Sequence, residues 1–259
     1  IWHTGTVTSR HRTLACIVAM TAVFTGGCAT EPETRVALAP EQDECVVLLH
    51  GLNRSWRAMR PMGEMLQADG FTVVNVDYPS QSATVEELAP EVIGIGVGAC
   101  REAGAGRVHF VTHSMGGILL RFENERAPIA GLGRVVMLGP PNQGSEIIDK
   151  TNDWPGFESL GGPAGAQLGT LDDSIPSQLG PVDFELGVIA GTATFNIFAS
   201  AMLPDEDDGK VTVERTKVEG MQDFLVVDHS HRFMMRMDVV RRNTLSFLRT
   251  GRFIDADRI

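Results

Sequence analysis

The sequence has little positive charge. It carries 22 Lys and Arg residues against 33 Asp and Glu residues, which gives a formal net charge of −11. A protein that binds nucleic acid gathers Lys and Arg to neutralise phosphate groups, so this balance argues against a nucleic-acid partner. The sequence also lacks a basic amphipathic helix of the kind that docks on anionic membranes. The composition therefore indicates a soluble globular protein whose function rests on neither contact.

No apolar run in the sequence is long enough to cross a membrane. The run at 14–24 has 11 residues, whereas a spanning helix needs about 20. A basic stretch at 10–12 precedes this run, and small residues lead from it to Cys28. This order is typical of a secretory signal. The stretch that ends at Cys28 resembles the lipobox of bacterial lipoproteins, although Thr25 stands where an aliphatic residue is usual.

The resemblance implies that residues 1–28 are a signal peptide of the lipoprotein type and that Cys28 is lipidated. Residues 29–43, rich in Glu, Pro, Ala and Thr, are expected to form a flexible tether, and 44–259 the folded domain. The protein would then be exported to the bacterial periplasm or held on a membrane by its lipid, with no transmembrane helix in the mature chain. The alternative is an ordinary cleaved signal that happens to contain a cysteine.

Cysteine is scarce, with four residues in the chain. Cys16 falls in the predicted signal and Cys28 at the processing site, so only Cys45 and Cys100 remain in the folded part. An exported protein meets an oxidising compartment, where an even pair of cysteines favours a disulfide. The alternative is two buried free thiols.

Internal repeats are also absent, and the order of elements has to be read from hydrophobic periodicity. Continuously apolar runs, typical of strands covered on both faces of a parallel sheet, lie at 45–50, 71–78, 107–112, 134–139, 186–191 and 224–227. Helical patterns lie between or after several of them, at 55–68, 85–101, 116–126 and 237–248. This alternation predicts an open α/β sheet with right-handed crossovers, in which ligands bind beyond the carboxyl ends of the strands.

The loop after the third predicted strand contains a serine at an abrupt turn. Thr112-His113-Ser114-Met115-Gly116 joins strand to helix without a polar turn cluster. Such a turn lifts a serine hydroxyl clear of the backbone and sets it at a helix N-terminus, where free N–H groups can bind an oxyanion. Small residues two positions on either side relieve contact between strand and helix, as in Gly-x-Ser-x-Gly. Here Gly116 is present, and Thr112 replaces the leading glycine.

The chain resembles the α/β-hydrolase superfamily, and within it bacterial lipases and esterases. The motifs that carry the resemblance are "VVLLHG", "VTHSMGG" and "PPNQGS", in that order. The resemblance implies an α/β-hydrolase fold with a mostly parallel central sheet and helices on both faces. It also implies a serine hydrolase that cleaves carboxylic esters, with Ser114 as the nucleophile.

In this superfamily the acid and then the base follow the serine. "Asp-Gly-Lys-Val" resembles the surroundings of the lipase acid, which selects Asp208, with Asp207 and then Asp228 as alternatives. "SHRFMM" resembles the surroundings of the lipase base, which selects His231 over His229. The remaining members of the acidic run and the other histidines are expected to be surface or core residues, and His50 to make structural hydrogen bonds.

In the implied mechanism His231 takes the proton of Ser114 and Asp208 fixes the imidazole tautomer. The backbone N–H groups of Leu52 and Met115 are expected to form the oxyanion hole. The reaction needs no cofactor and no metal, and the acidic run lacks regular calcium-loop spacing.

Two further questions stay open in the sequence. The segment between the strands at 134–139 and 186–191 is long enough for a small cap or flap but not for a second domain. An ester or lipid is the expected substrate. The alternatives are an acyltransferase that uses the same triad with an alcohol in place of water, and a non-catalytic hydrolase-like envelope protein.

Overall fold

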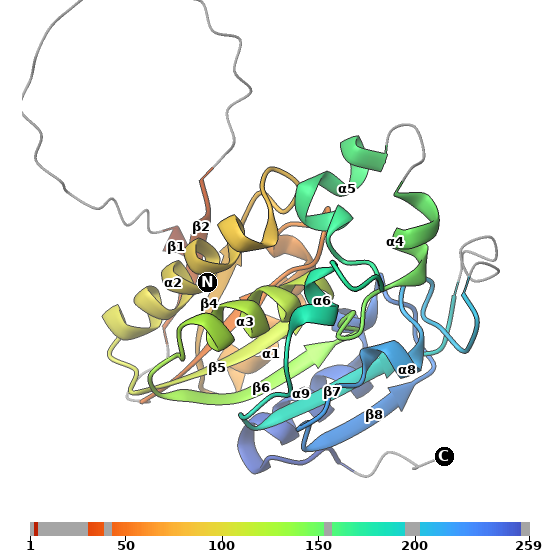
Figure 1. Ribbon diagram of the computed structural model, residues 1–259. Coiled ribbons are helices and arrows are strands. Elements are labelled where there is room, and N and C mark those ends of the chain that lie inside the picture. The colour runs from red at the N-terminus through yellow and green to blue at the C-terminus, as the bar shows by residue number, and fades with distance from the viewer. Residues whose placement is uncertain (1–2, 5–30, 39–42, 153–156, 195–202, 255–259) are drawn as a thin grey trace, which may run out of the picture.

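The computed structural model describes residues 3–4, 31–38, 43–152, 157–194 and 203–254 (Figure 1). Among these residues, eight strands form one sheet in the order β1-β2-β4-β3-β5-β6-β7-β8. The strands are β1 (His3–Thr4), β2 (Glu33–Ala37), β3 (Glu44–Leu49), β4 (Thr72–Asp77), β5 (Arg107–His113), β6 (Leu132–Leu138), β7 (Leu186–Gly191) and β8 (Asp223–Val227). All neighbours from β4 to β8 are parallel, and β1 and β2 extend the sheet antiparallel.

Helices cover both faces of this sheet. The main helices are α1 (Trp56–Ala68), α2 (Val85–Glu102), α3 (Met115–Arg126) and α9 (Asp238–Thr250). Alternate residues of a strand point to opposite faces: Val46 and Leu48 of β3 pack with α1 and α9, and Val47 and Leu49 pack with α2 and α3. Figure 1 shows α2 and α3 on the near face and α1 and α9 behind. The fold prediction is confirmed, with six strands and four helices within two residues of their expected ends.

Short helices were not predicted. Three of them, α4 (Glu146–Thr151), α5 (Phe157–Ala166) and α6 (Ile175–Gln178), lie between β6 and β7, where the sequence predicts a small cap or flap. The others are α8 (Val213–Thr216) and the 3₁₀ helix η1 (Met234–Arg236). Four of these helices have six residues or fewer, and α5 is interrupted by the non-helical backbone of Gly162, so none carries a sustained helical periodicity in the sequence.

The prediction of a flexible tether over 29–43 is wrong for β2. This strand pairs antiparallel with β4, with Val36 opposite Val74. Thr34 and Ala37 are buried against the sheet, and the Arg35 guanidinium stacks on the Trp56 ring. A strand of five residues with mixed polarity gives only a weak sequence signal. The domain therefore begins before residue 44.

Most of the predicted export segment lies outside the described residues. Cys28 is among them, as are 29–30 and 39–42 of the predicted tether. Within residues 1–28 the structure describes only His3–Thr4, which pair with β2.

A disulfide joins Cys45 of β3 to Cys100 of α2, as predicted. The two Cα atoms lie 5.7 Å apart, and the bridge spans 55 positions of the chain. Both cysteines are fully buried, so the bridge ties α2 to the central strand from within the core. Every helix in the described ranges is too short or too polar to span a bilayer.

Candidate active site

Ser114 occupies the sharp turn between β5 and α3. Its backbone has φ 54° and ψ −126°, and among the described non-glycine residues only Asn53 shares a positive φ. Such a conformation is strained for a residue with a Cβ and is typical of functional sites. The Ser114 N–H donates to the Leu138 carbonyl at 2.9 Å, which holds the turn against β6. A Cβ on Gly116 would lie 2.9 Å from the His50 carbonyl oxygen, so only glycine lets α3 approach β3 this closely.

Asp208 and His231 lie together, as the sequence predicts. The His231 Nδ1 is 2.7 Å from the Asp208 Oδ2, and both side chains are buried. The other carboxylate oxygen, Oδ1, accepts the backbone N–H groups of Lys210 and Val211 at 3.1 and 3.0 Å. The His231 N–H also donates to the Asp208 carbonyl. Since the carboxylate can only accept, Nδ1 of His231 carries the proton and Nε2 is left to act as a base.

The alternative residues have other surroundings. The Asp207 Oδ1 accepts the backbone N–H of Gly209 within its own turn. Asp228 is exposed, and the ring of His229 has no hydrogen bond to a described carboxylate. The pairing of Asp208 with His231 thus distinguishes both from their neighbours.

His113 links the segments of the site. Its Nε2 lies 2.9 Å from the His231 carbonyl, so this nitrogen donates, and the two rings are 4.7 Å apart between centroids. A Cβ on Gly51 would lie 2.8 Å from the His113 Nδ1 and 2.9 Å from the Ser114 Cβ. The loop after β3, the serine turn and the His231 loop therefore meet at one imidazole. Burial holds the pKa of His113 well below its ordinary value, with the nearby His231 acting in the same direction, so the ring is neutral.

The predicted oxyanion donors lie on two of these segments. Met115 opens α3 directly after Ser114, and Leu52 follows Gly51, whose backbone packs on the Ser114 Cβ. Neither the Leu52 nor the Met115 N–H is hydrogen-bonded to a described residue. Both groups are thus free to bind an oxygen of a substrate.

A buried histidine fixes the orientation of the Leu52 N–H. His50 Nδ1 donates to the Gly51 carbonyl at 2.9 Å, and its Nε2 accepts the Tyr78 N–H at 3.2 Å. The Gly51 carbonyl and the Leu52 N–H belong to one planar trans peptide and point in opposite directions. By binding the carbonyl on one side, His50 turns the N–H to the other. The prediction of structural hydrogen bonds for His50 is confirmed.

Tyr78 completes this support. It is the only tyrosine of the chain, its ring stacks on His50 at 4.0 Å, and its hydroxyl donates to the His50 carbonyl. Burial, with the nearby Asp77 carboxylate, raises the pKa of Tyr78 far above its ordinary value, so the hydroxyl stays protonated and remains a donor. Sequence reasoning missed this residue because His50 and Tyr78 are 28 positions apart.

The segment between β6 and β7 contacts the loop after β3, which contains Leu52. A Cβ on Gly165 of α5 would lie 2.9 Å from the Leu52 Cδ2, and the Ala164 N–H donates to the Ala83 carbonyl. Figure 1 shows α4 and α5 beyond the carboxyl ends of the strands. Of the short helices between β6 and β7, α5 therefore packs on the loop after β3, and α6 packs on α3.

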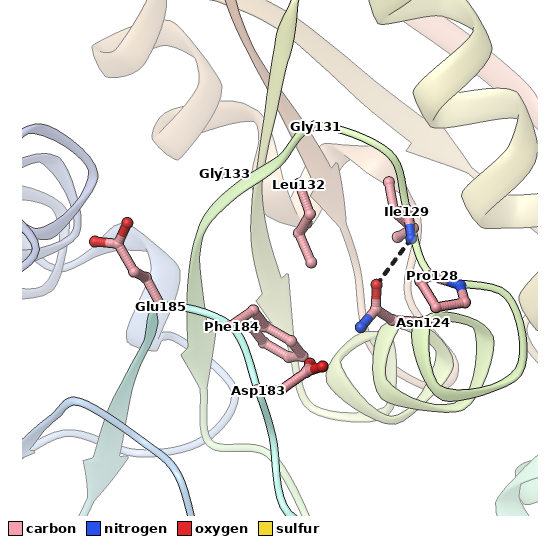
Figure 2. A pocket seen from close by; sticks show the side chains of 9 residues that line it. All are labelled: Asn124, Pro128, Ile129, Gly131, Leu132, Gly133, Asp183, Phe184 and Glu185. Atoms are coloured by element: carbon pink, nitrogen blue, oxygen red, sulfur yellow. Dashed lines mark hydrogen bonds between the residues drawn. The ribbon is translucent and has the colours of Figure 1, made fainter.

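An open pocket of about 420 Å³ lies elsewhere, at the amino end of β6 (Figure 2). Its lining residues come from the end of α3, the start of β6 and the turn before β7: Asn124, Pro128, Ile129, Gly131, Leu132, Gly133, Asp183, Phe184 and Glu185. Ser114 follows the opposite end of the neighbouring strand, since His113 pairs with Leu138 at the end of β6. The pocket is therefore not the site of Ser114. Among the described residues no cluster of His, Cys, Asp and Glu could hold a metal ion.

The sequence profile of the alpha/beta hydrolase family matches residues 46–242. The chain belongs to this family. Its fold is similar to a lipase of Bacillus licheniformis in its mature form, with a TM-score of 0.65 and 20% identity over 80% of this chain and 91% of that one. A thermophilic esterase from Thermogutta terrifontis has a TM-score of 0.56 and 15% identity, over 85% and 94% of the two chains.

An esterase of Pyrococcus furiosus has a TM-score of 0.55 and 19% identity, over 84% and 86% of the two chains. No curated protein sequence matches this member of the hydrolase family. At these identities the solved structures establish the fold alone. The reaction and the substrate have to be argued from the site.

Proposed function

We propose that the protein is a carboxylester hydrolase that works through Ser114, His231 and Asp208. The observation that carries this proposal is the buried pair of His231 and Asp208, joined through His113 to the strained turn at Ser114. A serine hydroxyl needs a neighbouring base to become a nucleophile. The family membership and the esterase and lipase neighbours support an ester as the substrate.

The proposed reaction has two stages, acylation of Ser114 and hydrolysis of the acyl-enzyme. The Ser114 Oγ attacks the ester carbonyl carbon while His231 Nε2 takes the hydroxyl proton. Asp208 stabilises the imidazolium through Nδ1–H, and the N–H groups of Leu52 and Met115 bind the oxyanion. The C–O bond to the alcohol then breaks, and the alcohol leaves with the proton from His231. Water, deprotonated by His231, then attacks the acyl carbon. The C–O bond to Ser114 breaks, His231 returns the proton to the Ser114 Oγ, and the acid leaves.

Hydrolysis of p-nitrophenyl butyrate tests the proposal. Ser114→Ala should lower kcat by at least about a thousandfold, because removing the nucleophile disables the triad as a unit. Ser246→Ala is the matched control, since Ser246 lies on α9 and bonds to the Arg252 carbonyl away from the site. Retention of more than a tenth of the activity in folded Ser114→Ala would rule out the assignment.

We also propose that the enzyme is exported and lipidated at Cys28. The basic stretch, the short apolar run and the small residues before Cys28 support this placement, as does the disulfide, which forms in oxidising compartments. The mature N-terminal peptide should begin at Cys28 and carry a lipid mass in mass spectrometry. An unmodified peptide that begins near residue 28 would mean an ordinary cleaved signal.

A further inference from the structure

Three arginines close to one another and to His113 form no salt bridge with a described carboxylate. Arg54 follows Leu52 by two residues, Arg232 follows His231 directly, and Arg236 belongs to η1. No described carboxylate forms a salt bridge with any of the three. In a chain with a net charge of −11, such a cluster runs against the overall composition.

Packing brings the three residues together. η1 packs against α1, and Arg54 stands just before that helix. The guanidinium carbons of Arg232 and Arg236 each lie 5.8 Å from the centre of the Phe233 ring, and Phe233 is 37% exposed. The surface beside His231 thus offers an accessible aromatic ring between two cations.

The charges of this cluster act on one another. Partial burial lowers the pKa of Arg54, and the charges of Arg232 and Arg236 lower it further. Like charges that repel are stabilised when an anion binds between them, and a guanidinium suits carboxylate and phosphate groups in particular.

We propose that Arg54, Arg232 and Arg236 bind a negatively charged group of the substrate, so that the preferred substrates are anionic esters. This inference rests on the proposed function, because it places the anion beside the ester that Ser114 attacks. The carboxylate of a soluble ester and the phosphate of an anionic lipid share this chemistry, and Phe233 supplies an apolar contact to either one.

Matched ester pairs test the charge of the substrate. Mono-p-nitrophenyl succinate and p-nitrophenyl butyrate differ by a carboxylate on the acyl side, and 4-acetoxybenzoate and its methyl ester differ by one on the alcohol side. The ratio of kcat/KM for the anionic to the neutral ester should fall about threefold in Arg232→Gln and in Arg236→Gln, and should also fall with added salt. Arg107→Gln is the matched control, because Arg107 is exposed at the amino end of β5, whereas Ser114 follows the carboxyl end of the same strand.

Vesicles distinguish a lipid from a soluble anion. Sedimentation needs no turnover, so the Ser114→Ala protein can be used. It should sediment with phosphatidylglycerol vesicles more than with phosphatidylcholine vesicles. Adding Arg232→Gln and Arg236→Gln to this variant should abolish the difference.

The two assays together identify the anion. If the arginines matter only for the ester pairs, the substrate is a soluble anionic ester. If they also matter for vesicle binding, the substrate is an anionic lipid. Equal ratios in all variants together with equal sedimentation would overturn the proposal. If the protein without substitutions hydrolyses none of these esters, the hydrolase assignment itself is contradicted.

Discussion

The Asp208 carboxylate has both oxygens engaged, one by two backbone N–H groups and the other by His231. Because these partners are all donors, the group is held as an acceptor and fixes the tautomer of His231. The sequence predicted this residue from a short motif in a run of four acidic residues. Residue type alone could not distinguish Asp208 from Asp207. The two differ in the partners of their side chains, because Asp207 accepts the Gly209 N–H and Asp208 contacts His231.

Asp208→Asn should lower kcat by about 10⁴-fold, because an amide can donate to Nδ1 and so favour the wrong imidazole tautomer. Asp207→Asn, the adjacent control, should lower kcat by less than about tenfold, since its carboxylate bonds within its own turn. Steady-state kinetics on one neutral ester measures both. A larger loss in Asp207→Asn than in Asp208→Asn would move the acid to the neighbouring residue.

At the scale of elements, the parallel order of β3 and β4 brings the loops after them together. This order sets His50 against Tyr78 and so orients the Leu52 N–H. The sequence predicted each strand from its apolar run, but which strands are neighbours depends on sheet order, which the runs do not carry. For the same reason the stack of His50 on Tyr78 could not be predicted, whereas Ser114 could be, because strand, turn and helix are contiguous there.

His50→Phe should lower kcat by about a hundredfold with little change in KM. The variant keeps an aromatic ring against Tyr78 but loses the bond to the Gly51 carbonyl, so the Leu52 N–H is no longer held toward the oxyanion. Tyr78→Phe is the control, since it removes only the bond to the His50 carbonyl. Equal loss of kcat in the two folded variants would contradict the proposed role of His50.

For the whole molecule, a disulfide between β3 and α2 joins the central strand to one helical layer. The pairing was predictable because only two cysteines lie outside the predicted export segment. The position of the domain boundary was not predictable, because β2 is stabilised by pairing with β4 and its own residues carry little signal. The short helices between β6 and β7 were not predicted for the same reason, because α5 is held by contacts with residues distant in sequence, such as Leu52 and Ala83.

The double variant Cys45→Ala/Cys100→Ala should lower the free energy of unfolding by about 4 kcal/mol, as expected for opening a loop of this length in the unfolded chain. Alanine suits both positions because both are buried. Urea unfolding measures the difference, and the reduced native protein should match the double variant. An unchanged free energy of unfolding would show that the bridge does not stabilise the fold.

Covalent labelling tests the central claim most directly. A p-nitrophenyl phosphonate ester should react with the protein at one site, and peptide mass spectrometry should find the adduct on the peptide that contains Ser114. The account predicts that labelling is lost in Ser114→Ala and is slowed in His231→Ala, because His231 activates the hydroxyl. Absence of an adduct on the folded protein, or an adduct on another serine, would contradict it.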